Sequence, residues 1–348
     1  MRIGKLLLTT GRKSGRAFAL LLAFSIALFL GALLDSVVVS YPVAGRLYAG
    51  QTGLEDNAHL GQDGDMSNLA GSESIVLFEN NFPTRLALGL DNDIYVSDAK
   101  ADTVFIYDAE LNLAGKLVGI PRPLGVAVAP NGNIYVGSDA RDEVQIYDER
   151  GVRIQTIGSG AIRMPNDLVV DRDGWLYVAD SLSNKVWIFD PNGVPAGSAG
   201  STGDVPGQLD FPVAITIGYR TEGNVEVGEL YVADQRHARI KVFDLMGKFL
   251  RAYGDRITRG MASSNWHGKF ARIQSLAIDA RGRLHAVDCY MNNVQILDAD
   301  TGGYIDSYGQ FGAAEGQLNV PLDVLIVGGK VIITNAGNKR VEVIYTVP

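Results

Sequence analysis

The sequence predicts an all-β protein, a six-bladed β-propeller, preceded by an N-terminal transmembrane or signal helix. Three observations carry this prediction. A unit of about 40 residues recurs six times, each unit holds four short strand-like runs, and an apolar run lies near the N-terminus. The composition is consistent with a globular domain, because 47% of the 348 residues are hydrophobic and this share is sufficient for a large core.

The N-terminal segment combines basic residues with an apolar run. No acid precedes Asp35, and Ser25 is the one polar side chain within 17–34. As a helix this run rises about 27 Å, close to the ~30 Å of bilayer hydrocarbon. We therefore expect residues 1–40 to form a basic cytoplasmic flank and a membrane anchor, with a cleaved signal peptide as the alternative.

The basic flank predicts that the rest of the chain lies outside the cytoplasm, in the periplasm or at the cell exterior, or is secreted if the segment is cleaved. Of 31 Lys and Arg residues, five lie in the flank, which leaves 26 against 39 Asp and Glu and a balance of −13. This balance argues against nucleic-acid binding. The single cysteine, Cys289, excludes internal disulfides and cysteine-ligated zinc clusters.

Residues 41–73 are rich in Gly, Asn and Asp and show no hydrophobic periodicity. We expect a flexible tether there. The repeats occupy residues 74–348, which we expect to form one propeller domain.

Each repeat reads as an aliphatic run, a Gly/Asn/Asp turn, an IYVAD-like run, a polar turn, an alternating run and a final short strand. Four strands in about 40 residues are typical of a propeller blade. The equivalent positions are 40, 42, 54, 54 and 47 residues apart: Tyr95, Tyr135, Tyr177, Tyr231, His285 and Ile332.

Ring closure is also indicated. The sixth unit ends after its third strand at the C-terminus, and the apolar segment 74–78 precedes the first unit. We expect 74–78 to be the fourth strand of the last blade, since this pairing removes an open sheet edge.

The pattern resembles the NHL-repeat family of six-bladed propellers over residues 74–348. The resemblance is carried by MPNDLVVDRDGWLYVADSLSNKVWIFD at 164–190 and by the linkers GQLDFP at 207–212, GKFARI at 268–273 and GQLNVP at 316–321. It implies the fold and, mostly, binding roles, although some similar propellers are metal-dependent lyases or hydrolases. Fold alone does not determine function.

An acid or amide closes the second strand of each unit. Residues that recur in every blade serve the scaffold, so we expect these side chains to accept hydrogen bonds from turn N–H groups. They are Asp98, Asp139 (displaced by one position), Asp180, Asp234, Asp288 and Asn335.

Residues that break the repeat are better candidates for function. Asp167 and Asp323 fall at equivalent inner-strand positions of opposite blades, with Asn166 and Gln274 nearby. They are the candidate Ca²⁺ ligands, and no other cofactor is predicted. The alternative is a solvated channel mouth in which Arg85 balances the two acids.

The loop 254–269 lengthens the link between the fourth and fifth units, and long loops on rigid scaffolds often carry function. Trp and Arg are favoured interface anchors, although Trp266 packed onto its own propeller is an alternative. We expect the channel-mouth face to meet an anionic ligand such as a polysaccharide, or an extracytoplasmic protein; an evenly solvated surface is the alternative. The candidate contacts are Arg85, Arg122, Arg163, Arg236, Arg256, Arg259, Trp266 and His267.

The function expected from the sequence is therefore binding or scaffolding by a monomeric propeller tethered to the membrane. The competing prediction is a metal-dependent lyase or hydrolase with Ca²⁺ at Asp167 and Asp323. No catalytic residue is predicted, because the sequence has no histidine cluster, no G-x-S-x-G motif and no recognisable acid–base pair.

Overall fold

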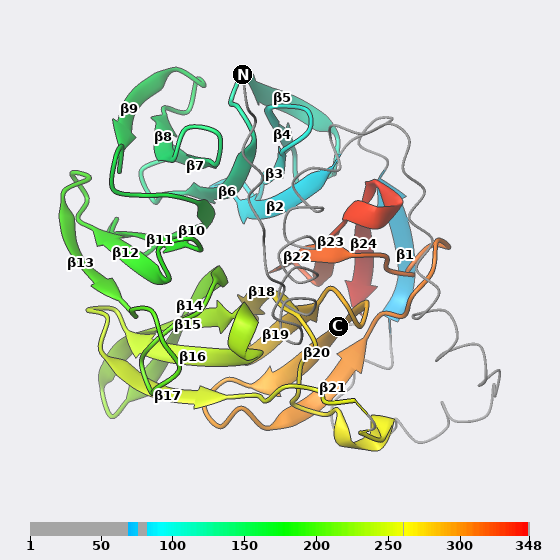
Figure 1. Cartoon of the computed structure of the whole chain (residues 1–348). Helices are drawn as coiled ribbons and strands as arrows, with labels where there is room; N and C mark the ends of the chain where they lie inside the picture. The colour runs from blue at the N-terminus through cyan, green and yellow to red at the C-terminus, as the bar shows by residue number, and fades with distance from the viewer. Residues whose placement is uncertain (1–68, 76–81, 260, 347–348) are drawn as a thin grey trace, which may run out of the picture. The chain divides into compact units, whose positions relative to one another are not determined.

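The computed structural model describes residues 69–75, 82–259 and 261–346. These residues form six four-stranded antiparallel sheets, and each sheet is one blade (Figure 1). Blade 1 contains β2 (Pro83–Leu88), β3 (Ile94–Asp98), β4 (Thr103–Tyr107) and β5 (Leu113–Val118).

Blades 2 to 6 repeat this order, with the first strand innermost and the fourth outermost. Blades 2 and 3 contain β6 (Pro123–Val128), β7 (Ile134–Ser138), β8 (Glu143–Tyr147), β9 (Arg153–Ile157), β10 (Pro165–Val170), β11 (Leu176–Asp180), β12 (Lys185–Phe189) and β13 (Pro195–Ala199). Blades 4 and 5 contain β14 (Pro212–Glu222), β15 (Val225–Asp234), β16 (Arg239–Asp244), β17 (Phe249–Tyr253), β18 (Ile273–Ile278), β19 (Arg283–Asp288), β20 (Asn293–Asp298) and β21 (Tyr304–Tyr308). Blade 6 contains β22 (Pro321–Val327), β23 (Lys330–Asn335), β24 (Arg340–Thr346) and β1 (Leu69–Ile75).

The inner strands of successive blades contact one another around the whole ring, and β22 of blade 6 contacts β2 of blade 1. Apolar side chains fill the space between neighbouring sheets. Between blades 2 and 3, for example, Val144 and Ile146 share a buried cluster with Leu168 and Val178. The predicted six-bladed propeller is therefore confirmed.

The ring is closed by β1, which pairs antiparallel with β24 from Leu69↔Thr346 to Ile75↔Val341. This strand begins five residues before the predicted segment 74–78, so the predicted tether is wrong over 69–73. The segment LAGSESI is not an apolar run. Its place in the sheet is given by backbone pairing with β24, which hydrophobic patterning does not reveal.

The predicted membrane or signal segment, residues 1–40, lies outside the described residues. Within the described ranges, no helix combines the length and apolar character needed to cross a membrane. The helices there are short 3₁₀ turns, η2 (Gln235–His237), η3 (Ser263–Asn265) and η4 (Ala336–Asn338).

In blades 1, 3, 4 and 5 the acid that closes the second strand ties the blade to the linker that enters it. The Asp180 carboxylate accepts hydrogen bonds from the backbone N–H groups of Arg163 (3.0 Å) and Met164 (3.1 Å). It also accepts one from Ser183 in the following turn at 3.2 Å. Asp98 and Asp288 hold their linkers and turns in the same way, which confirms the scaffold interpretation.

Blade 2 departs from this rule, and the assignment of Asp139 to the capping position is wrong. Ser138 ends β7, and its hydroxyl donates to the Pro121 carbonyl at 2.6 Å. A hydroxyl that donates to the linker carbonyl thus replaces a carboxylate that accepts from linker N–H groups. Asp139 instead forms an ion pair with Arg122.

Candidate functional site at the ring axis

All six inner strands have an irregular register near their first residues, at the same level of the ring. The third residue of each inner strand lies at this level, and in blade 2 it is Gly125. A Cβ at Gly125 would lie 2.8 Å from the Asp167 Cα, a distance that real Cβ atoms do not adopt. The backbones are therefore crowded at the axis, and blade 2 accommodates this crowding with a glycine.

The guanidinium of Arg85 occupies the axis at this level, and the residue is 0% exposed. Arg85 extends from blade 1 and donates to one carbonyl in each of blades 3 to 6. The acceptors are the carbonyl oxygens of Asn166 (3.2 Å), Val213 (2.5 Å), Gln274 (2.9 Å) and Leu322 (2.9 Å). One side chain thus links five of the six blades.

The two predicted acids flank this guanidinium. Arg85 Nε lies 4.0 Å from Asp167 Oδ1, and Arg85 Nη1 lies 3.7 Å from Asp323 Oδ1. Arg85 therefore balances the acids, as the alternative interpretation predicts. It does so in a buried cluster rather than at a solvated mouth, so its predicted contact with a partner at the surface is not supported by its position.

The carboxylates do not have the arrangement of a calcium site. Asp167 accepts from the N–H groups of Leu168 (3.0 Å) and Ile215 (2.9 Å). Asp323 accepts from the Leu86 N–H at 2.6 Å and from the Ser275 hydroxyl. All four oxygens thus have donors and a protein cation lies between them, whereas Ca²⁺ requires six to eight oxygen ligands.

Burial shapes the electrostatics of the axis. It raises the pKa of Asp167 to about 7, although the charge of Arg85 opposes this shift. Burial also raises the pKa of Asp323, again against the influence of Arg85. The folded axis therefore takes up a proton more readily than the unfolded chain does.

We expect this uptake to appear as a pH dependence of stability. An acid whose folded-state pKa is raised stabilises the fold at low pH, and that contribution falls as the pH rises from about 4 to 7. The free energy of unfolding of the wild type, measured in urea, should fall relative to that of Asp167→Asn by up to ~1.4 kcal/mol per pH unit in this window. Parallel pH profiles for the two proteins would show that Asp167 does not take up the proton.

Above Arg85, toward the end of the ring that carries the interblade linkers, lies a set of neutral polar side chains. Gln235 Nε2 donates to Gln274 Oε1 at 2.8 Å. Asn166 Nδ2 donates to the Ser181 hydroxyl at 3.0 Å. Burial raises the pKa of the nearby Cys289 to about 12, so its thiol stays protonated at neutral pH and is a poor nucleophile. These buried side chains hydrogen-bond to one another, and Cys289 is not an activated nucleophile among them.

Gln235 and Cys289 were not predicted from the sequence as members of this set. Each follows directly after the acid that closes the second strand, at Asp234 and Asp288. The position directly after this acid could therefore have identified both residues from the sequence, because the turn that begins there leads back toward the axis.

The predicted loop 254–269 folds onto its own propeller. Arg256 forms a parallel bridge with Phe270, and its guanidinium donates to the Arg236 carbonyl. Trp266 is partly buried, and its indole N–H donates to the Met261 carbonyl at 3.3 Å. The exposed His267 ring stacks on Tyr304 with centroids 4.0 Å apart. Arg256 and His267 thus contact residues of the blades, whereas the Trp266 hydrogen bond stays within the loop.

The remaining predicted arginines lie on the linker face, the end of the ring formed by the interblade linkers and the turns after the second strands. Arg236 pairs with Asp210 at 3.1 Å and lies 4.7 Å from the Phe211 ring centroid. Arg122 pairs with Asp139. Arg163 and Arg259 are exposed on this face. Arg122 and Arg236 are thus already paired with neighbouring acids.

No family model and no curated protein matches this sequence. Solved structures do match the fold. A gluconolactonase from Xanthomonas campestris, XC5397, has 16% identity and a TM-score of 0.59, over 80% of this chain and 91% of that chain. Virginiamycin B lyase from Staphylococcus aureus has 10% identity and a TM-score of 0.55, over 79% and 98%.

A third match is the hydrazine synthase of Kuenenia stuttgartiensis, with 15% identity and a TM-score of 0.56, over 78% of this chain and 97% of that chain. At these identities the likeness concerns the fold alone, and membership of the NHL-repeat family stays a prediction. Enzymatic and binding roles both occur on such propellers. The chain is a six-bladed β-propeller.

Proposed function

We propose that this propeller is a binding or scaffolding module that recognises an anionic partner, a polysaccharide or a protein, on its linker face. It would act outside the cytoplasm, held at the membrane by the apolar segment 17–34. One observation carries the proposal. Exposed arginines and large exposed apolar side chains occur together on the linker face, while Arg85 closes the axis beneath them.

The exposed apolar side chains support a docking surface. Tyr290 is 59% exposed in the turn after β19, and Phe311 is 69% exposed in the linker to blade 6. Aromatic residues and arginine are enriched in protein interfaces and dominate their binding energy. Arg163 and Arg259 supply the positive charge that an anionic partner requires.

The competing enzymatic function depends on a metal ion at Asp167 and Asp323. The geometry of these residues does not fit that ion, because Arg85 lies between them and their oxygens already accept hydrogen bonds. Among the described residues, no group of three or more His, Cys, Asp and Glu side chains is arranged to hold a metal. We therefore favour binding over metal-dependent catalysis.

The proposal is tested by charge reversal at Arg163→Glu together with Arg259→Glu. Binding is measured by biolayer interferometry against a panel of anionic and neutral polysaccharides and of extracytoplasmic proteins. We expect the wild type to bind anionic members and the double variant to bind them roughly tenfold more weakly, because two charge-assisted contacts are reversed.

The matched control is Arg281→Glu, which changes an exposed arginine in a turn on the opposite face. It should leave the affinity unchanged, and higher salt should weaken binding of the wild type. Equal binding by wild type and double variant, or binding of neutral polysaccharides alone, would contradict the proposal.

A further inference from the structure

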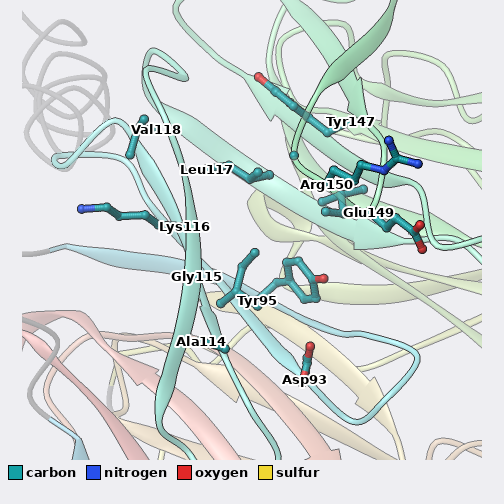
Figure 2. Close-up of a pocket in the computed structure, with 13 residues that line it drawn as sticks. Asp93, Tyr95, Ala114, Gly115, Lys116, Leu117, Val118, Tyr147, Glu149 and Arg150 are labelled. Carbon is teal, nitrogen blue, oxygen red and sulfur yellow. The ribbon is translucent and has the colours of Figure 1, made fainter.

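A cavity of about 480 Å³ lies between blades 1 and 2, away from the axis. Its walls include β5 of blade 1 and the turn between β8 and β9 of blade 2 (Figure 2). Figure 2 shows Tyr95 and Asp93 on one side of this space and Glu149 and Arg150 on the other, while the Lys116 side chain points away from it. The polar groups of the lining are two carboxylates, the phenols of Tyr95 and Tyr147, and the basic side chains of Lys116 and Arg150. The Tyr147 hydroxyl already donates to Gln145 at 2.6 Å.

The sheet register identifies the equivalent position in blade 4. In blade 1, Gly115 of β5 pairs with Ile106, which pairs with Tyr95. In blade 4, Arg251 of β17 pairs with Val242, which pairs with Tyr231. Gly115 therefore takes the place of Arg251, and Tyr95 takes the place of Tyr231.

The acids correspond as well. Asp93 lies two residues before Tyr95, and Glu229 lies two residues before Tyr231. The acid and the tyrosine thus occur in both blades, and the arginine occurs in blade 4 alone.

Blade 4 shows what these groups bind. The Arg251 guanidinium donates to both oxygens of Glu229, at 2.8 and 2.6 Å. It also donates to the Tyr231 hydroxyl and to the carbonyl of Ala299 in the next blade, each at 3.2 Å. A planar fork of donors thus meets a carboxylate in the bidentate way that distinguishes arginine from lysine.

In blade 1 the corresponding acceptors, Asp93 and Tyr95, are present, but Gly115 stands where blade 4 has the Arg251 guanidinium. Neither the Asp93 carboxylate nor the Tyr95 hydroxyl has a hydrogen-bond partner among the residues that the structure describes. Tyr95 is partly exposed, whereas Tyr231 beneath Arg251 is 3% exposed. Glu149 occupies the place of Ala299, one residue after the aspartate that begins the turn, and adds a second carboxylate.

The acids around Asp93 favour a cation beside its carboxylate. Burial, followed by repulsion from Asp91 and Asp108, raises the pKa of Asp93. Arg150 is exposed at the rim and forms no ion pair with either carboxylate within the described chain. A bound cation would offset the repulsion among these acids.

Blade 3 has the glycine at this position but not the acid. Gly197 of β13 occupies the same position, since it pairs with Ile188, which pairs with Tyr177. The residue two places before Tyr177 is Trp175, which packs in the apolar cluster of that interface. The combination of a small residue and an acid occurs in blade 1 and not in blade 3.

We propose that the cavity between blades 1 and 2 binds a guanidinium group, from a small molecule such as agmatine or from an arginine side chain of a peptide. The group would take the place that Arg251 fills in blade 4. Asp93 would accept its paired N–H donors, and Tyr95 and Glu149 would accept the rest.

The test is calorimetric titration of the full chain with three probes: N-acetyl-arginine amide, agmatine and N-acetyl-citrulline amide. Citrulline has the shape of arginine without its charge. We expect the guanidinium probes to bind and the citrulline probe to fail, and Asp93→Asn to weaken binding roughly tenfold or more. If N-acetyl-arginine amide binds more tightly than agmatine, the natural ligand is an arginine side chain of a peptide. If agmatine binds equally well or more tightly, the natural ligand is a small molecule.

Gly115→Arg supplies the guanidinium from within the chain and should abolish binding of the probes. Its matched control is Gly197→Arg, which places the same side chain in blade 3 and should leave the affinity unchanged. Gly115→Ala is a milder control, because its Cβ would lie 3.7 Å from Ile106 Cδ1, an ordinary contact. It should fold and retain binding.

Equal binding of citrulline, or no loss of affinity in Asp93→Asn, would overturn the proposal. So would the absence of binding up to millimolar concentrations of the guanidinium probes. The double variant at Arg163 and Arg259 should bind these probes like the wild type, so this test is independent of partner binding on the linker face.

Discussion

Arg85→Met is expected to lower the free energy of unfolding by about 3–5 kcal/mol and the melting temperature by about 10 °C. The change removes the cation between two buried carboxylates and leaves four axial carbonyls without their donor. An uncompensated buried charge costs more than the ion pair contributes. Urea and thermal unfolding measure the loss, with Arg281→Met as the control on an exposed surface.

The triple variant Arg85→Met with Asp167→Asn and Asp323→Asn separates lost packing from unpaired charge. It should recover part of the stability lost in Arg85→Met, because the acids no longer carry charge. If the triple variant is less stable than Arg85→Met, the hydrogen bonds of the carboxylates matter more than their charge. Unchanged stability in Arg85→Met would refute a central role for the arginine.

A chain that begins at residue 76, and so lacks β1, is expected to melt at a markedly lower temperature and to self-associate. Each lost backbone hydrogen bond contributes roughly 0.5–1.5 kcal/mol. The loss also leaves β24 as an open edge that can pair with another chain. Differential scanning calorimetry and light scattering measure the two effects.

The control for this truncation is a chain that begins at residue 60, which keeps β1 and should match the parent propeller in both measurements. If the two shortened chains melt together and remain monomeric, β1 does not close the ring in solution. In that case the sixth blade is stable with three strands.

The sequence predicted the blades well because their pattern is local. Each blade repeats an alternation of apolar and polar residues, and an acid such as Asp180 marks the same turn in one repeat after another. The closing strand was placed less accurately, because LAGSESI has no apolar alternation and is defined by its pairing partner at the other end of the chain.

At the axis, the repeat correctly placed Asp167 and Asp323 opposite each other with Arg85 at the same level. It did not show how far the Arg85 side chain reaches, since its acceptors lie in four other blades. The cavity beside Tyr95 was also missed. It depends on the absence of a side chain at Gly115, and it becomes apparent only when aligned strands reveal Arg251 at that place.

The reach of Arg85 also constrains the order in which the protein can be completed. Its four carbonyl acceptors follow it in the chain by 81, 128, 189 and 237 residues. At ~5–20 residues per second of synthesis, the last acceptor emerges roughly 10–50 s after the arginine. The strand that closes the ring waits for its C-terminal partner in the same way. Early blades therefore spend this interval without their central contact, and the final stability arises only after the last blade has been made.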